Sequence, residues 1–434
     1  MSLAFVGVSG IVILLLILFL FGMPVGFAMA LVGFLGFCYV VSFKAGLNMV
    51  GSVLWETFSK YGLTVIPLFI LMGQVAFYSG VNEKLYQAAY RWVGHIRGGL
   101  AMATVAACSA FAAICGSNAA TAATMTTVAL PQMDKYKYNP RLSAGAIACG
   151  STLGVVIPPS VVLIIIGLST EQSIARLFYG GIGAGALLTL LLALSIYLIC
   201  RIHPDWGPAG PKTTFMEKIA SLSGAFEMIV LFSLVMAGLY FGFFTPAEAG
   251  AVGSLFAILI TAAQRRLSWK GFVAAVSDTL RVSCMVMVIV AGAMIFGRFL
   301  AVTRIPFDIA SWVAGLPISG WGVMAIIFTV YIIGGAVMDA LALLLITIPI
   351  FFPVAIQLGY DPVWFGVTIT VVTTLGAVTP PVGATTYVVG GMAKGLPLEE
   401  VFKGVAYFLP AYVLCVILLM LFPGLVLIPA GFLR

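Results

Sequence analysis

Long apolar runs separated by short polar segments recur along the whole chain. Many of these runs contain about 18 to 20 residues, which is enough for a helix to cross a bilayer core of roughly 30 Å. Because backbone polar groups must be hydrogen-bonded inside a bilayer, such runs form helices rather than extended chain. The pattern therefore predicts an all-α polytopic membrane protein whose main partner is the lipid bilayer.

Composition supports this prediction and excludes several classes of protein. Of the 434 residues, 62% are hydrophobic and only 8% are charged, and the mean hydropathy is +1.18. A water-soluble core of this size cannot bury so much apolar surface, and the chain leaves no room for a soluble catalytic domain. The net charge of +7 is modest, so we interpret it as a determinant of membrane topology and expect no nucleic-acid partner.

The second half of the chain repeats the first at a fixed offset. The block STLGVVIPP at 151–159 returns as TTLGAVTPP at 373–381, and further prolines and glycines match at the same spacing. Internal repeats of this kind are typical of duplicated membrane transporters. We therefore predict two structural repeats, residues 1–210 and residues 211–434.

Each repeat is predicted to contain five crossings and one re-entrant hairpin. The hairpins, at about 100–133 and 322–353, each consist of two apolar segments that are short for a full crossing and are interrupted by small or polar residues. One crossing in each repeat, at 141–170 and 363–393, is broken by a Pro-Pro pair, as in transporters with discontinuous helices. The other predicted crossings are 3–22, 24–42, 62–80, 178–200, 222–244, 246–263, 283–301 and 404–427.

An odd number of crossings inverts the second repeat relative to the first. With the amino terminus outside, the inner side receives 14 Lys and Arg residues and the outer side receives five. This distribution satisfies the positive-inside rule. We therefore predict that both termini face outward, that the first hairpin opens toward the cytoplasm and that the second opens toward the outside.

The tip of the first hairpin is a candidate ligand site. Its sequence, CGSNAAT at 115–121, places the oxygen atoms of Ser117 and Asn118 beside a glycine that lets the backbone turn. Non-helical backbone at membrane depth is tolerated only where protein or a water-filled cavity satisfies it. The helix that restarts after the tip also points N–H groups at the midplane, where they favour an anion. The alternative is a packing interface made of small residues.

The Pro-Pro breaks suggest a cation site. Pro158 lacks an N–H group, so the preceding carbonyls of about residues 154–157 lose helical partners. Freed carbonyls together with Ser and Asn oxygens suit a hard, weakly charged cation such as Na⁺. A simple proline kink is the alternative, but the second repeat carries a matching break, TTLGAVTPPVG at 373–383.

Three charged residues stand out inside apolar sequence. Asp339 is the only acidic residue deep in the region around the second hairpin tip, and a charge there is costly unless it has a partner or a function. It is a candidate Na⁺ ligand or proton carrier, with helix capping as the alternative. Arg298 and Arg304 are candidate partners for a carboxylate or sulfonate, and snorkelling to the interface is their alternative role.

Motifs for catalysis and for nucleotide binding are absent from the sequence. We find no HExxH, GxSxG, GxxxxGK[ST] or Cys/His cluster. We therefore predict that the protein is not an enzyme and that any accumulation of a solute is driven by an ion gradient.

Four motifs resemble one known family. The stretch GSNAATAATMTTVALPQMDKYKYNPRLSAG, the following GSTLGVVIPPS and the later TPAEAGAVG and TLGAVTPPVG closely resemble the large membrane subunit of TRAP transporters, the DctM family. The resemblance implies a bacterial inner-membrane protein with both termini in the periplasm, Na⁺ coupling and an elevator-type movement. It also implies two protein partners, a small four-helix membrane subunit and a periplasmic binding protein that delivers a small organic anion.

The resemblance also assigns roles to residues. The expected Na⁺ ligands are side chains or backbone groups at Ser117, Asn118, Gly150, Gly154, Pro158, Asp339, Thr373, Gly376 and Thr379. From the chemistry of the residues themselves, the expected substrate contacts are Ser117, Asn118, Ser160, Arg298, Arg304, Asp339 and Gly383.

Three other functions remain open at this stage. A self-sufficient Na⁺/dicarboxylate-type symporter with the same hairpin design would transport without partner proteins. An anion channel would conduct without an ion gradient, but it needs no paired broken helices. An intramembrane enzyme would require a nucleophile and base pair that the sequence does not suggest.

Overall fold

The computed structural model describes residues 3–314, 317–393 and 395–432, so the extreme ends of both predicted repeats lie outside it. Within these ranges the chain forms α-helices, two short 3₁₀ helices and connecting turns, which confirms the all-α membrane fold. Eight of the described helices are long and apolar enough to cross a membrane. The number rises to nine if α20 (Leu398–Ala406) and α21 (Leu409–Leu421), which meet at 41°, are counted together as one span.

Among the described residues, the first half of the chain forms eleven α-helices. They are α1 (Leu3–Phe21), α2 (Val25–Val40), α3 (Phe43–Ser59), α4 (Val65–Tyr78), α5 (Val81–Val93), α6 (Gly99–Cys115), α7 (Asn118–Lys135), α8 (Pro140–Ser151), α9 (Leu153–Val156), α10 (Val161–Thr170) and α11 (Ile174–Ile202). The predicted first hairpin is the pair α6 and α7, and the predicted broken crossing is α8, α9 and α10.

The described part of the second half also forms eleven α-helices. They are α12 (Phe215–Tyr240), α13 (Pro246–Ala263), α14 (Trp269–Val302), α15 (Ile305–Ala314), α16 (Gly320–Gly335), α17 (Ala340–Gln357), α18 (Pro362–Val378), α19 (Ala384–Met392), α20 (Leu398–Ala406), α21 (Leu409–Leu421) and α22 (Gly424–Gly431). The predicted second hairpin is α16 and α17, and the broken crossing is α18 and α19. The predicted crossing at 24–42 corresponds to α2, and the first part of the predicted crossing at 363–393 corresponds to α18. Both are apolar helices shorter than 18 residues.

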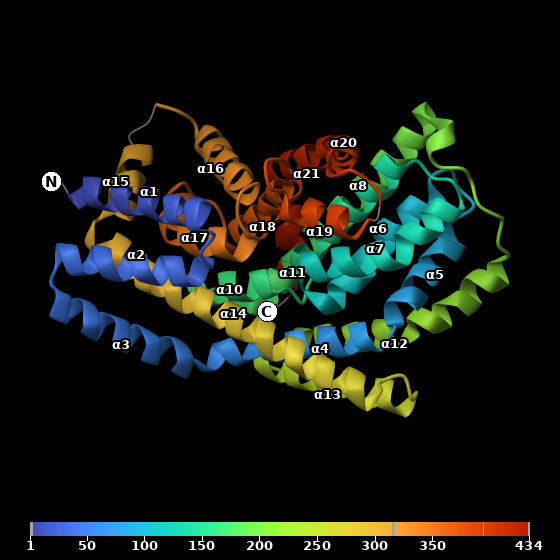
Figure 1. Cartoon of the computed structure of the whole chain (residues 1–434), viewed down its shortest axis with the longest axis horizontal. Helices are drawn as coiled ribbons and strands as arrows, with labels where there is room; N and C mark the ends of the chain where they lie inside the picture. The colour runs from blue at the N-terminus through green and yellow to red at the C-terminus, as the bar shows by residue number, and fades with distance from the viewer. Residues whose placement is uncertain (1–2, 315–316, 394, 433–434) are drawn as a thin grey trace.

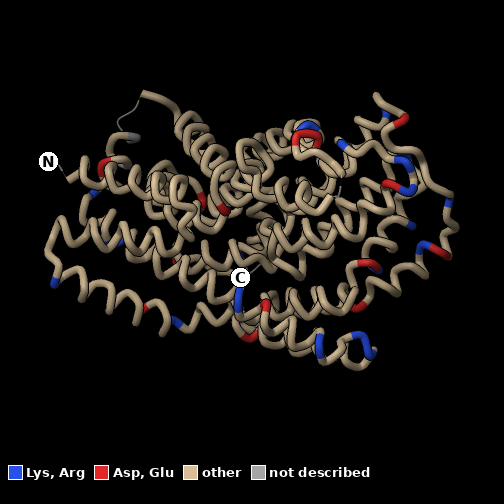
Figure 2. The backbone as a smooth tube through the Cα atoms, in the orientation of Figure 1, with Lys and Arg blue, Asp and Glu red and all other residues tan. Residues whose placement is uncertain are grey.

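The helices fall into two groups. We call α1–α5 and α12–α15 the scaffold group, and α6–α11 and α16–α22 the hairpin group. Figure 1 shows α3, α4, α12, α13 and α14 along one long side of the molecule, with the hairpins and broken helices on the other. Charged residues lie mainly at helix ends and in connecting turns, many of them around the edge of the molecule (Figure 2).

Helices at corresponding positions of the two halves pack reciprocally. In the hairpin group, α7 packs on α19 and α17 packs on α10, so that each hairpin contacts the broken crossing of the other half. Each hairpin also contacts the broken crossing of its own half, through α6 with α8 and α16 with α18. In the scaffold group α2 packs on α14 and α13 packs on α4. This pairing supports the predicted division into two repeats, which stays a prediction.

Local sequence explains where several helices begin. The side chain of Asn139 accepts a hydrogen bond from the N–H of Arg141 at the start of α8, and Asp361 caps α18 in the same way. In each case a proline follows at the first helical position, where its missing N–H costs nothing. Thr245 and Glu248 form a capping box at the start of α13.

The helices α3 and α15 were not predicted. The buried residues of α3, Gly46, Met49, Val53 and Thr57, recur every three or four positions and therefore form one face, which packs on α2 and α14. Its polar residues make it too hydrophilic to cross a bilayer, so a search for long apolar runs passes over it. The helix α14 begins at Trp269, well before the predicted start at residue 283, for the same reason.

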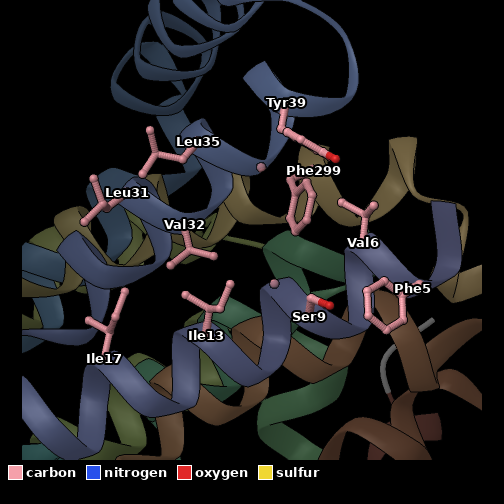
Figure 3. A pocket seen from close by; sticks show the side chains of 12 residues that line it. Phe5, Val6, Ser9, Ile13, Ile17, Leu31, Val32, Leu35, Tyr39 and Phe299 are labelled. Atoms are coloured by element: carbon pink, nitrogen blue, oxygen red, sulfur yellow. The ribbon is translucent and has the colours of Figure 1, made fainter. Parts of the chain in front are cut away.

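The scaffold group also carries an apolar groove on its surface. An apolar groove of about 310 Å³ runs between α1 and α2, with Phe299 of α14 at its floor (Figure 3). Among its lining side chains only Ser9 and Tyr39 carry a hydroxyl group. A pocket for a small organic anion needs several convergent polar groups, so this groove is not a candidate for the transport site.

Candidate transport site between the hairpin tips

The tips of the two hairpins line one cavity, although they are more than 200 residues apart in the sequence. This tip cavity has a volume of about 320 Å³. Hairpin 1 contributes residues 115–120 and hairpin 2 contributes residues 339–341. The remaining walls come from α4, α9, α10 and α14, and they are formed by Ile70, Gln74, Val155, Val161, Val162, Val282, Met285 and Val286.

The first tip is built by a glycine and a serine cap. Gly116 ends α6 with a φ of +62°, a conformation that side-chain-bearing residues rarely adopt. Ser117 then caps α7, where its hydroxyl oxygen accepts a hydrogen bond from the N–H of Ala120. The carbonyl oxygen of Ser117 accepts hydrogen bonds from the N–H and the hydroxyl of Thr121. These contacts start α7 at the wall of the cavity, which residues 115–120 line.

Asn118 is the strongest candidate ion ligand at this tip. Its side-chain oxygen Oδ1 is buried and has no hydrogen-bond partner in the described structure. A buried amide oxygen without a partner loses its hydration without compensation. A bound Na⁺ would satisfy it, because neutral carbonyl and amide oxygens are good ligands for hard cations.

The first Pro-Pro break packs directly against this tip. A methyl group added at Gly154 would lie 2.7 Å from the carbonyl oxygen of Ser117, so only glycine fits there. A methyl group at Gly116 would lie 2.9 Å from the carbonyl oxygen of Pro159. Residues 150–160 are all buried. The structure therefore brings together three predicted site residues, Ser117, Asn118 and Gly154. It places Pro158 beside them, because the next residue, Pro159, packs against the tip.

The carbonyl groups of residues 154–157 were predicted to be free, but Ser160 binds one of them. Its hydroxyl donates a hydrogen bond to the carbonyl oxygen of Val155 at 2.5 Å, so that carbonyl is not free. The hydroxyl oxygen also accepts the N–H of Leu163 at the start of α10. Ser160 thus joins the two sides of the break, and its hydroxyl is already engaged rather than open to a substrate.

The second tip packs on the second break in a similar way. A methyl group at Gly376 would lie 2.6 Å from the carbonyl oxygen of Ile332 and 2.7 Å from Gly335. The carbonyl oxygen of Ala336 accepts hydrogen bonds from the N–H groups of Val382 (3.0 Å) and Gly383 (3.2 Å). Unlike the first break, this one is partly open, because residues 380–382 are exposed.

Asp339 faces the tip cavity and caps a helix at the same time. One carboxylate oxygen accepts a hydrogen bond from the N–H of Leu341 at 2.9 Å, which starts α17. The residue is exposed and lines the tip cavity opposite Ser117 and Asn118. The capping role of Asp339 is therefore confirmed, whereas its role as a Na⁺ ligand or proton carrier stays a prediction.

Other predicted site residues lie elsewhere. Gly150 packs on Cys108 of α6, not on a tip. The hydroxyl of Thr379 donates to the carbonyl oxygen of Gly376. Thr373 does lie at the second tip, because a methyl group at Gly335 would lie 2.8 Å from its carbonyl oxygen, but its hydroxyl donates to Ile369 of its own helix.

The two predicted arginines are not among the residues that line the tip cavity. Arg298 forms an ion pair with Glu56 of α3 at 3.3 Å. Arg304 is exposed in the turn between α14 and α15. Helix length explains the separation, because α14 borders the tip cavity at residues 282–286 and Arg298 lies three turns further along, about 18 Å away.

Gln74 is a cavity residue that sequence reasoning missed. It lines the tip cavity from α4. The available signal was a single amide side chain inside the otherwise apolar run VIPLFILMGQVAFY. Polar residues in membrane helices generally face a protein interior or a cavity.

Tyr412 of α21 supports the break behind the first tip. Its hydroxyl donates to the carbonyl oxygen of Cys149 at 2.9 Å and lies 2.6 Å from the hydroxyl of Thr152. Tyr412 is completely buried, so these contacts are shielded from water and fix the junction between α8 and α9.

Tyr412→Phe is expected to destabilise the protein by about 1 to 2 kcal/mol, because the buried hydrogen-bond network loses one member. The measurement is the thermal unfolding midpoint of the purified protein. Tyr387→Phe is the matched control, since Tyr387 is 49% exposed. Equal midpoints for the two variants would contradict the supporting role of Tyr412.

Comparisons with known proteins cover nearly the whole chain. The family model described as tripartite ATP-independent periplasmic transporter, DctM component, matches residues 12–425. The C4-dicarboxylate TRAP transporter large permease protein DctM of Pseudomonas aeruginosa is 39% identical over 348 residues, which is 80% of either chain. The sialic acid TRAP transporter large permease protein SiaM of Vibrio cholerae is 30% identical over 408 residues, which is 94% of either chain.

Among solved structures, the YdaH transporter of Alcanivorax borkumensis is similar in fold. It superposes with a TM-score of 0.63 over 88% of this chain and 89% of its own, at 16% sequence identity. At that identity the similarity concerns the fold alone.

Proposed function

The chain belongs to the DctM component family of tripartite ATP-independent periplasmic (TRAP) transporters, and from this premise we propose that it is the large permease subunit of a Na⁺-coupled importer of a small organic anion. The observation that carries the proposal is the tip cavity. Two hairpin tips and two broken helices converge there, and helix ends at membrane depth are the groups with which transporters bind ions and anions.

The substrate class is proposed from the relatives and from the cavity. The names of the Pseudomonas aeruginosa and Vibrio cholerae relatives refer to C4-dicarboxylates and to sialic acid, and both are carboxylic acids. In this chain α7 begins at the tip cavity, and the N-terminal end of a helix attracts a carboxylate or sulfonate. A volume of about 320 Å³ is of the size that small-molecule pockets have.

Na⁺ coupling is proposed from the oxygen atoms at the tips. Within the described residues no group of three or more His, Cys, Asp or Glu gathers in one place, so the oxygen-rich tips are the best cation ligands that the geometry offers. The unpartnered Oδ1 of Asn118 and the carboxylate of Asp339 both line the tip cavity or lie beside it. A cation held there would offset the charge of the incoming anion.

The division into two helix groups supports an elevator-type movement. The hairpin group carries both tips and both breaks, whereas α4 and α14 of the scaffold group form one wall of the tip cavity. Movement of the hairpin group along this wall would expose the cavity to each side of the membrane in turn. We propose that a small membrane subunit binds the scaffold group and that a periplasmic binding protein delivers the anion.

Uptake into proteoliposomes tests the proposal. Vesicles that contain this chain with its small membrane subunit are supplied with labelled organic acids, with and without an inward Na⁺ gradient and the purified binding protein. We expect uptake only when both the gradient and the binding protein are present.

Two other outcomes would redirect the assignment. Uptake without the binding protein would identify a self-sufficient symporter. Uptake that follows a proton gradient and ignores Na⁺ would make Asp339 a proton carrier instead of an ion ligand.

A further inference from the structure

A second cavity with charged walls lies between the scaffold group and the hairpin group. It has a volume of about 330 Å³. We call it the charged cavity, because its lining includes Lys60, Arg298, Glu56 and Glu171. On the topology predicted from the Lys and Arg distribution, this end of the molecule faces outward.

The charged cavity lies on the same helix faces as the tip cavity. The residues Val282, Val286, Val290, Ala293 and Gly297 follow one another along α14 at intervals of three or four, the first two in the tip cavity and the others in the charged cavity. Such spacing keeps side chains on one face of a helix.

The helices α10 and α17 show the same continuity. On α10, Val162 borders the tip cavity and Ser169 borders the charged cavity. On α17, Leu341 borders the tip cavity and Leu345 and Pro349 border the charged cavity. These separations of four to eight residues correspond to about 6 to 12 Å along a helix. The two cavities therefore lie one above the other along a single seam between the two helix groups.

Polar groups in the charged cavity are incompletely paired. Arg298 contacts Glu56 at 3.3 Å, with both side chains more than half exposed, and an ion pair of this kind contributes little. Lys60 has no ion-pair partner within the described ranges. Thr57 is only 3% exposed and lines the cavity, yet its hydroxyl has no hydrogen-bond partner there.

From this arrangement we infer that the charged cavity is an entry site that holds the organic anion, through Arg298, Lys60 and Thr57, before the anion reaches the tip cavity. A carboxylate or sulfonate displaces Glu56 from Arg298, because a bidentate contact with guanidinium is stronger than the single long contact present. The inference rests on the proposed import of an organic anion. It gives Arg298 a role about 18 Å from the tips, where the sequence alone suggested direct contact with the central site.

The ion pair between Glu56 and Arg298 allows a test that distinguishes a structural role of the pair from anion binding. If Glu56 and Arg298 only hold α3 against α14, then Glu56→Gln and Arg298→Gln both break the pair and act alike. If the cavity binds an anion, Glu56→Gln frees Arg298 and strengthens anion binding, whereas Arg298→Gln weakens it. Lys60→Gln is then expected to act like Arg298→Gln.

Thiol labelling can measure the effect of these substitutions on anion binding, and it does not require transport. A Ser169→Cys reporter is placed in a background where Cys38 and Cys284, the two cysteines that are not buried, are replaced by serine. The assembled membrane complex is treated with a sulfonate-bearing and with a trimethylammonium-bearing methanethiosulfonate, and the ratio of their labelling rates is measured.

We expect Arg298→Gln to lower the sulfonate-to-ammonium ratio at least about threefold and Glu56→Gln to raise it by a similar factor, as expected for one charge at close range. An excess of isethionate should slow labelling by the sulfonate reagent in the unsubstituted protein. Lys44→Gln is the matched control, because Lys44 lies on α3 about 18 Å from Glu56, beyond the range of screened charge.

Equal directions of change for Glu56→Gln and Arg298→Gln would overturn the inference, as would an unchanged ratio in Arg298→Gln or a lack of effect of isethionate. Because labelling does not depend on uptake, its failure is distinguishable from failure of the proposed function, which is measured by Na⁺-dependent uptake into proteoliposomes.

Discussion

Gly154→Ala is expected to reduce Na⁺-driven uptake at least about 100-fold while the protein still folds and assembles. The added methyl group would lie 2.7 Å from the carbonyl oxygen of Ser117 and 3.1 Å from the backbone nitrogen of Asn118. Both neighbours are backbone atoms, so the tip itself has to move. Overpacking of this kind costs about 1 to 3 kcal/mol, and a shift of the tip removes Asn118 from its place beside the break.

The measurement is initial uptake in proteoliposomes, normalised to the amount of folded protein from size-exclusion chromatography. Gly391→Ala is a matched control, because Gly391 lies in the other broken crossing and a methyl group there meets no atom within 4 Å. Gly376→Ala is expected to resemble Gly154→Ala, since it would press against Gly335 of the second tip. Normal uptake by both Gly154→Ala and Gly376→Ala would contradict the proposed role of the tip contacts.

Asp339→Asn is expected to uncouple uptake from Na⁺ and to lower the initial rate at least about tenfold. Asparagine caps a helix about as well as aspartate, so α17 should still begin at Ala340. The substitution therefore removes the negative charge from the tip cavity and leaves the fold of the hairpin intact. A carboxylate binds a hard cation more strongly than a neutral amide does, and the affinity for Na⁺ falls for that reason.

The coupling is measured as the dependence of uptake on external Na⁺ concentration. Asp339→Ala separates the two roles of the residue, because it removes both the cap and the charge and should also lower the thermal unfolding midpoint. If Asp339→Asn keeps the Na⁺ dependence of the unsubstituted protein, Asp339 serves only as a cap and Na⁺ binds elsewhere.

The sequence predicted those features that depend on local chemistry. Asn139 and Asp361 are followed by proline, a pairing that is typical of helix starts, and both residues cap helices in the structure. The Pro-Pro pairs at 158 and 380 interrupt the two crossings as predicted, because proline cannot donate to the preceding turn. Glycine and a serine cap place the first tip at Gly116 and Ser117, where the prediction had it.

Features that depend on packing between distant segments were not predictable from one sequence. Arg298 stands in an apolar run, which signals an unusual environment, but its neighbour Glu56 comes from α3, a helix too polar to be found by apolar length. Gln74 likewise reaches the tip cavity only because α4 packs beside α10 and hairpin 1. Shape complementarity decides which distant segments pack together, and composition and periodicity carry no information about it.

The unequal exposure of the two breaks sets an order of events for the coupling ion. Residues 150–160 are buried, whereas residues 380–382 are exposed. On the proposed coupling, an ion at the second break exchanges with the surrounding solution while the hairpins stay in place. An ion at the first break is trapped until hairpin 1 moves away from Gly154. On this proposal the two breaks load and unload in sequence, with the first break as the kinetically slow member of the pair.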